Sequence, residues 1–240
     1  MLIVSGLAAL LFAWMFMHGV RNALRWDAFH VAYLAVLLLL AALFAWFPFD
    51  HWRFERRLTD LAVELSGRQS VEVNCSTVTS SVFDLPWLAG RAHSGTGEIY
   101  ILYPTCPQLK DYAADPDHAG EPEVFALHVF VHEAMHVRGE LNEQLTDCQA
   151  IQRSYRAARL FGAAEAVARR QGVMYFEGAY RRHDYYSSAC RPGGPMDEQL
   201  ADSSWHFLAD GARAADCSSL EGRRGALVDS VLSLAKVRCE

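Results

Sequence analysis

Two long stretches of the sequence contain no Asp, Glu, Lys or Arg, namely residues 1–20 and 28–49. Each is close to the roughly 20 residues that an α-helix needs to cross about 30 Å of hydrocarbon. The segment between them is too short for a folded domain, so we expect a transmembrane helical hairpin with helices over about 1–20 and 28–49. A cleaved signal peptide is the alternative for residues 1–20. It is disfavoured because no basic segment precedes the apolar run and no small-residue cleavage site precedes Arg21.

The chain also lacks an excess of basic residues. Its 240 residues include 22 Lys and Arg against 28 Asp and Glu, which gives a formal net charge of -6. A nucleic-acid-binding surface needs a basic patch to neutralise phosphates, so we expect no nucleic-acid partner. The sequence has no dinucleotide-binding, P-loop or serine-hydrolase motif and no internal repeat, which excludes those enzyme classes and repeat folds.

The six cysteines lack the C-x-x-C spacing that is typical of thiolate zinc sites and redox motifs. All of them follow residue 50, and their even number predicts three disulfides in an oxidising compartment. Residues 51–240 are therefore expected to form an extracytoplasmic domain, with both termini on the same side of the membrane. The arginines of the short loop agree with this orientation, whereas those after residue 52 oppose it. Our guess at the pairing is Cys75–Cys106, Cys148–Cys190 and Cys217–Cys239.

Residues 51–240 are predicted to be mainly helical with a small β-sheet, an α+β domain. Apolar alternation predicts strands over 70–74 and 98–103. Residues 107–122 contain three prolines and several aspartates and are expected to form a loop after a short helical turn, and 184–197 are expected to be irregular. Helical spacing predicts five helices, over 53–66 with Gly67 as its stop, 123–137, 142–161, 163–182 and the last 20 or so residues.

The motif that indicates chemistry is His-Glu-Ala-Met-His at residues 132–136. On a helix, positions i and i+4 share one face, so His132 and His136 can both bind one Zn²⁺ ion. Glu133 lies about 100° around the helix, beside the metal, where a carboxylate can accept a proton from water. We therefore expect a zinc site with Glu133 as the catalytic base.

A catalytic zinc site needs a third protein ligand. Glu143 follows the first histidine by 11 residues, and a continuous helix would place it about 16 Å away. Gly139 can end the helix in a left-handed conformation, and Asn142 can cap a second helix whose first turn holds Glu143. Glu143 is then the favoured ligand, and the alternatives are Glu140 and Asp147. If Asp147 is not a ligand, it can hold a histidine by its other ring nitrogen.

Four further residues are considered for the site. His128, one turn before His132, is expected to line the cleft rather than to bind metal. A downstream Tyr or His can stabilise an oxyanion, and the candidates near the cysteine-containing loop are His183, Tyr185 and Tyr186. Packing and surface roles are the simpler interpretation of these three.

The motif HEAMHVRGELNEQLTD (132–147) resembles the gluzincin branch of zinc metallopeptidases. NEQLTD (142–147) matches the Asn-Glu-x-x-Ser/Thr-Asp pattern of that branch, and the resemblance implies Glu143 as a ligand and Asp147 as a partner of the ligands. Gluzincins have a longer insertion between the two motifs, which nearly touch here. The start also resembles metzincins, although Asn142 stands where their third histidine would be. With ILYPTC (101–106) and SSACRPGGPMD (187–197), the segment is similar to uncharacterised actinobacterial zincin-like membrane or secreted proteins.

These features lead to one favoured function and two alternatives. The favoured function is a zinc metallopeptidase, anchored in a lipid bilayer, that hydrolyses a peptide or protein substrate outside the cytoplasm. A zincin-like module whose metal has no catalytic role, and which acts in the envelope or in an interaction, is the second possibility. The third is that the hairpin assembles with another membrane protein and the remaining domain is regulatory.

Overall fold

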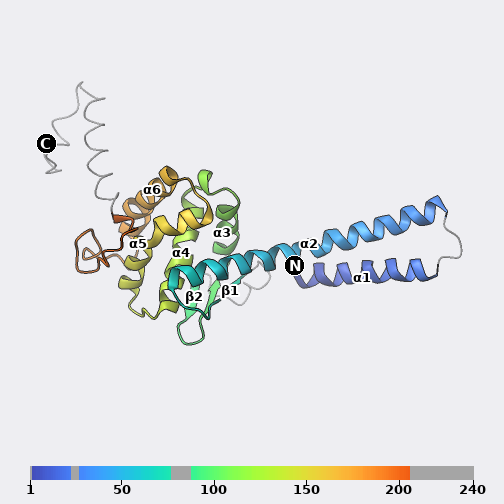
Figure 1. Ribbon diagram of the computed structural model, residues 1–240, viewed down its shortest axis with the longest axis horizontal. Coiled ribbons are helices and arrows are strands. Elements are labelled where there is room, and N and C mark those ends of the chain that lie inside the picture. Colours follow the sequence, from blue (N-terminus) through green and yellow to red (C-terminus); the bar gives the residue numbers. More distant parts are fainter. Residues whose placement is uncertain (1, 23–26, 77–87, 206–240) are drawn as a thin grey trace, which may run out of the picture.

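The computed structural model describes residues 2–22, 27–76 and 88–205. This part of the chain is mainly helical, with one three-stranded sheet and two long apolar helices at its N-terminal end (Figure 1). The helix that we expect at the C-terminus and the Cys217–Cys239 pair lie outside the described residues.

The two N-terminal helices, α1 (Leu2–Arg21) and α2 (Ala28–Ser66), lie side by side in a hairpin that projects from the rest of the molecule (Figure 1). Asp27 caps α2 by accepting a 2.7 Å hydrogen bond from the backbone N–H of His30. Both helices are long and apolar enough to cross a membrane, and their most apolar stretches are 0% and 11% buried. They are thus not packed like the core helices of a globular domain.

Helix α2 joins two segments that the sequence analysis separates. Its 39 residues include both the apolar segment 28–49 and the helix expected over 53–66, so the expected domain boundary at residue 50 falls inside one continuous helix. The helix ends as expected at Gly67, whose φ of 72° is left-handed. The C-terminal half of α2 is a core element, with buried residues Phe54, Leu58, Ala62 and Leu65.

The sheet consists of β1 (Glu72–Cys75), β2 (Gly90–His93) and β3 (Glu98–Ile101), in the order β1-β3-β2. Strand β1 is parallel to β3, and β2 is antiparallel to it. Strands β1 and β3 correspond to the two predicted strands. We did not predict β2, whose residues show no apolar alternation, and it forms one edge of the sheet.

The loop predicted over 107–122 is wrong for its first half. Residues Thr105–Ala114 form helix α3, followed by a 3-10 turn, Pro116–His118. Pro107 is compatible with this helix because it lies in the first turn, where backbone N–H groups have no partner within the helix. Leu109 and Tyr112 are fully buried and hold α3 in the core.

Helix α4 is central to the domain and packs against α2, α3, α5 and the sheet. The remaining helices follow the predicted pattern, except that the last one changes type: a π-helical turn and a 3-10 turn succeed α6. Their bounds are α4 Glu121–Arg138, α5 Glu143–Phe161, α6 Glu165–Met174, the π-helical turn Tyr175–Ala179 and the 3-10 turn Tyr180–Arg182.

Two of the three guessed disulfides are present. Cys75–Cys106 joins the end of β1 to the first turn of α3, and Cys148–Cys190 joins α5 to the irregular segment that follows the last 3-10 turn. No cysteine within the described ranges is free. Both bonds therefore hold neighbouring elements together in the part of the chain that follows the apolar hairpin, which we call the soluble part.

Candidate metal centre

The connection between α4 and α5 has the expected break. Helix α4 ends at Gly139, whose φ of 118° is left-handed. Asn142 then caps α5, since its side-chain oxygen accepts a 3.0 Å hydrogen bond from the backbone N–H of Leu145. The chain therefore turns back at once, and Glu143 begins α5 close to the histidines of α4.

Three side-chain atoms from these helices converge. The Nε2 atoms of His132 and His136 lie 3.0 Å apart. Oε2 of Glu143 is 3.2 Å from Nε2 of His132 and 3.3 Å from Nε2 of His136. The structure thus brings together the two histidines of the motif and the favoured third residue, in a group that could hold a metal ion.

The second nitrogen of each ring determines where its electron pair points. Nδ1 of His136 lies 2.8 Å from the backbone oxygen of Glu140, which can only accept, so Nδ1 is the donor. Nδ1 of His132 lies 3.2 Å from Oδ1 of Asp147 and donates to it. Both Nε2 atoms then direct lone pairs toward Oε2 of Glu143. A proton or a metal cation must lie among these three acceptors.

Asp147 lies between two histidines. Besides its contact with His132, Oδ1 accepts a 2.6 Å hydrogen bond from Nε2 of His128. His128, His132 and Asp147 form a second, fully buried group whose ligand atoms are close enough to hold a metal ion. His128 lines the cleft as expected, but the sequence analysis missed its bond to Asp147. The i, i+4 spacing of His128 and His132, which places both rings on one face of the helix, could have indicated this bond.

Burial and neighbouring charges determine the protonation of Asp147 and of the two histidines beside it. Burial raises the pKa of Asp147, but the adjacent imidazoles of His128 and His132 lower it more, and the net shift is well below the usual range. Burial lowers the pKa of His128 against the opposing effect of Asp147. The pKa of His132 is also reduced by burial, yet its bond to Asp147 and the charge of Glu133 raise it overall. Asp147 is therefore a carboxylate, and His128 is a neutral donor to it.

Glu133 is buried beside the cluster and reaches the same pocket. Burial raises the pKa of Glu133 to about 7, with His132 lowering it and Glu143 raising it. Its Oε2 atom has no hydrogen-bond partner among the residues that the structure describes. A carboxylate with this pKa and a free oxygen can both accept and donate a proton near neutral pH.

The pocket has a volume of about 640 Å³ and lies between one face of α4 and the edge strand β2. The histidine cluster lies at the pocket, and Leu88, Phe125 and Val129 are apolar residues of its lining. Residues 88–92, which include most of β2, line the opposite wall. The cluster thus opens into a cleft with an edge strand beside it.

The three oxyanion candidates have different surroundings. The ring of Tyr185 lies 6.0 Å from the ring of His132 at an angle of 18°, and Tyr185 and His183 both line the pocket. Tyr186 packs instead against Tyr180 and is 46% exposed. Tyr185 and His183 therefore reach the site, whereas Tyr186 does not.

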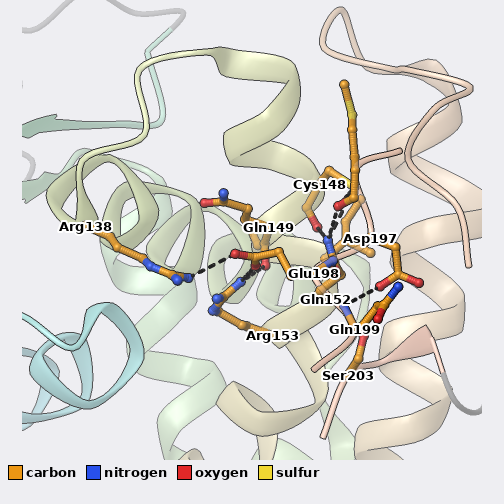
Figure 2. Close-up of polar contacts among 12 residues, drawn as sticks. Arg138, Cys148, Gln149, Gln152, Arg153, Asp197, Glu198, Gln199 and Ser203 are labelled. Carbon is orange, nitrogen blue, oxygen red and sulfur yellow. Dashed lines mark hydrogen bonds and ion pairs between the residues drawn. The ribbon is translucent and has the colours of Figure 1, made fainter. Parts of the chain in front are cut away.

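The segment that carries Tyr185 is held against α5 by more than the Cys148–Cys190 bond. Figure 2 shows Gln152 of α5 at the middle of this contact. Its amide nitrogen donates to the backbone oxygen of Met196 at 2.9 Å, and its amide oxygen accepts from the backbone N–H of Glu198 at 2.8 Å. The carboxylate of Glu198 forms an ion pair with Arg153. This network holds the segment that follows Tyr185 against α5.

Comparisons of this chain with family models, with curated proteins and with solved structures find no match.

Proposed function

We propose that this protein is a zinc-dependent peptidase, anchored by its N-terminal hairpin and acting outside the cytoplasm. The observation that carries the proposal is the convergence of three electron pairs, from His132, His136 and Glu143, at the floor of an open pocket. A tetrahedral zinc ion with ligands about 2.0–2.1 Å away holds neighbouring ligand atoms about 3.3–3.4 Å apart. The separations of 3.0, 3.2 and 3.3 Å fit that geometry.

The buried group around Asp147 fits a supporting role better than a metal site of its own. Its 2.6 Å separation between Oδ1 of Asp147 and Nε2 of His128 is the length of a direct hydrogen bond and is shorter than the distance between two zinc ligands. A carboxylate that accepts from the far nitrogen of a ligating histidine fixes the ring and raises its basicity. We therefore assign Asp147 to orienting His132.

Glu133 is the proposed catalytic base. Zinc, when bound, would supply Lewis acidity and lower the pKa of a water molecule. Glu133 would accept a proton from that water as it attacks the peptide carbonyl and would then give the proton to the leaving amine. Its buried position beside the cluster, with one oxygen that has no hydrogen-bond partner among the described residues, suits both transfers. Tyr185 lies on the wall of the same pocket, where its hydroxyl is a candidate donor to the developing oxyanion.

An extended peptide suits the shape of the pocket. Strand β2 forms an edge of the sheet and borders the cleft, and an edge strand offers backbone N–H and C=O groups to a peptide that adds to the sheet. The apolar side formed by Phe125 and Val129 would accept a hydrophobic side chain. These features favour a peptide over a small polar substrate.

Two observations support the proposed location. The apolar stretches of α1 and α2 are almost entirely exposed, as membrane-spanning helices are when no lipid surrounds them. The two disulfides indicate an oxidising compartment for the soluble part. We propose on these grounds that the hairpin spans a membrane and that the rest of the chain lies outside the cytoplasm.

The test uses the full-length protein in detergent or nanodiscs, with its zinc content and its hydrolysis of a peptide library measured together. We expect about one zinc per chain and metal-dependent hydrolysis in the wild type. Glu133→Gln retains the shape of the side chain and should keep the zinc while reducing hydrolysis at least about 100-fold. Stoichiometric zinc in both proteins, with equal and metal-independent behaviour toward the library, would instead indicate a module whose metal has no catalytic role.

A further inference from the structure

Helix α2 connects the apolar hairpin to the soluble part without a linker. Its C-terminal half is buried in the core through Phe54, Leu58 and Ala62. Asp50 of α2 also forms an ion pair with Lys110 of α3, and Arg57 donates a 3.0 Å hydrogen bond to the backbone oxygen of Phe161. Pro48 lies within α2 at the membrane end of this connection, where a bend can change the tilt of the soluble part. The continuous helix still limits the height of the soluble part above any membrane that the hairpin crosses.

Aromatic side chains mark where α2 would leave such a membrane. Four of them are about half exposed within seven residues of the helix, and the first charged residue after the apolar run, Asp50, lies among them. The guanidinium groups of Arg53 and Arg56 stack over two of these rings. Aromatic rings of this kind gather at the interface between hydrocarbon and water. The four are Trp46, Phe47, Phe49 and Trp52.

The metal centre lies alongside the far end of α2. Arg68, two residues after the last residue of that helix, donates to the backbone oxygen of Ser94, which lines the pocket. It also donates at 3.3 Å to the backbone oxygen of Val137, the neighbour of His136. From Phe49 to the end of α2 at residue 66 the helix rises about 25 Å. The cluster is thus held at most about 25 Å above the aromatic boundary.

Strand β1 runs back along α2 toward this boundary. The backbone N–H of Val73 donates to the hydroxyl of Thr59 at 3.0 Å. Two residues further on, the N–H of Cys75 donates to Oε1 of Glu55 at 2.9 Å, one helical turn closer to the apolar segment. The strand and the helix are therefore broadly antiparallel.

The register of the sheet then gives the direction of the cleft. Cys75 pairs with Ile101 of β3, and Ile101 pairs with Gly90 of β2. Because β2 is antiparallel to β3, it runs from Gly90 away from the boundary to His93. The wall of the pocket that β2 forms therefore extends broadly along α2.

We propose that the substrate is a protein anchored in the same membrane, which is cleaved in the extended stalk that rises from the bilayer. This inference rests on the proposed peptidase function. A stalk that emerges from the membrane beside the hairpin already runs along the direction of β2. At about 3.3 Å per extended residue, a height of at most about 25 Å corresponds to at most about eight residues between the membrane and the bond that is cut.

Confinement to one membrane favours such a substrate. Two proteins that share a bilayer meet at a much higher effective concentration than proteins in free solution. A rigid anchor also presents the catalytic centre at one height, so only bonds at a matching distance from the membrane reach it. The height of the catalytic centre thus selects substrates by the length of their stalk, and the pocket beside β2 selects them by their side chains.

The experiment uses full-length protein in liposomes with a synthetic substrate that has one transmembrane helix. A polar stalk of about 4, 8, 12 or 16 residues separates that helix from a cleavage sequence chosen from the peptide library. We expect the fastest cleavage with a stalk of at most about 8 residues and slower cleavage with stalks of about 12 and 16 residues. The same sequence as a free peptide, at equal bulk concentration, should be cleaved at least tenfold more slowly.

An insertion in α2 tests the role of its length. Seven helix-forming residues inserted between Phe49 and Asp50 raise the soluble part by about 10 Å and rotate it by only about 20°. The preferred stalk should become longer by about three residues. The matched control inserts seven Gly and Ser residues at the same point, which should broaden the dependence on stalk length without moving the free-peptide rate.

The outcomes separate this inference from the peptidase function on which it rests. If the free peptide is hydrolysed but cleavage of the anchored substrate is independent of stalk length in every variant, the inference is wrong and the peptidase stands. If neither the free nor the anchored substrate is hydrolysed by zinc-loaded wild type, the peptidase function is wrong and the inference is lost with it.

Discussion

A Cβ atom at Gly90 would lie only 2.8 Å from Oε1 of Glu133. It would also lie 2.9 Å from Cγ of that side chain and 3.0 Å from Cγ1 of Val129. Strand β2 can therefore approach α4 this closely only with glycine at this position. The edge of the sheet and the proposed base are brought together by the absence of one methyl group.

The first prediction follows from that contact. Gly90→Ala should push β2 or the Glu133 carboxylate aside, because the added Cβ would lie less than 3.0 Å from two atoms of that side chain. We expect kcat/KM for peptide hydrolysis to fall at least tenfold while zinc content stays at the wild-type value. The substitution should also destabilise the protein by about 1–3 kcal/mol through overpacking, measured as a lower free energy of unfolding.

Gly95 offers a matched control in the neighbouring turn, since a Cβ there would meet no atom within 4 Å. Gly95→Ala should retain wild-type hydrolysis and stability. Wild-type hydrolysis by Gly90→Ala would mean that the close approach of β2 does not position Glu133.

A second prediction separates the two nearest candidates for the third ligand. Oε1 of Glu140 accepts hydrogen bonds from the backbone N–H groups of Leu141 and Asn142, at 2.9 and 2.8 Å, and so shapes the connection between the helices. Glu143 instead directs its carboxylate at both histidines. Glu143→Ala should lose stoichiometric zinc, measured by metal analysis after gel filtration, whereas Glu140→Ala should keep it. Retention of zinc by Glu143→Ala would require another ligand.

The parts of the fold that could be predicted from the sequence are those with strong local signals. Period-3.6 apolar spacing and terminal glycines predict α4 and α5 nearly to the residue. Strand β2 could not be predicted, because its only buried residue is Gly90, so its four residues carry no apolar alternation and are held by pairing to β3. Helix α3 was missed because the prolines and aspartates in and after it favour loops locally, and the burial of Leu109 and Tyr112 outweighs that preference.

The site was predictable as far as helix geometry determines it. Two rows of side chains at i, i+4 spacing face each other across the turn at Gly139: the histidines of α4, and Glu143 with Asp147 of α5. The residue spacing predicts both rows, but it does not predict the position of one helix along the axis of the other. That offset decides that Asp147 bonds both His128 and His132, and only packing between the helices determines it.

The third prediction concerns this shared carboxylate. Asp147→Asn keeps the size of the side chain but removes the charge that holds two imidazoles. We expect the Kd for zinc to rise about 10- to 100-fold, because His132 loses the partner that fixes its ring. Competition with a chelator of known affinity measures the change. Asp202→Asn is the control. Asp202 forms an ion pair with Arg156, a residue of α5 that is not part of the site, so this substitution should leave the Kd for zinc unchanged. A wild-type Kd in Asp147→Asn would contradict the assignment.

The last prediction compares two adjacent tyrosines. Tyr185 lines the pocket with its ring facing His132, and burial and nearby carboxylates raise the pKa of its hydroxyl, so it stays a protonated donor at neutral pH. If this hydroxyl stabilises the oxyanion, Tyr185→Phe should lower kcat at least tenfold with little change in KM or zinc content, because the interaction forms only in the transition state. Tyr186→Phe removes the same atom from a ring outside the pocket and should have wild-type kinetics. Equal kcat values for both variants would show that Tyr185 acts only in packing, and the donor would then have to be sought among other groups on the pocket wall, of which His183 is the nearest along the chain.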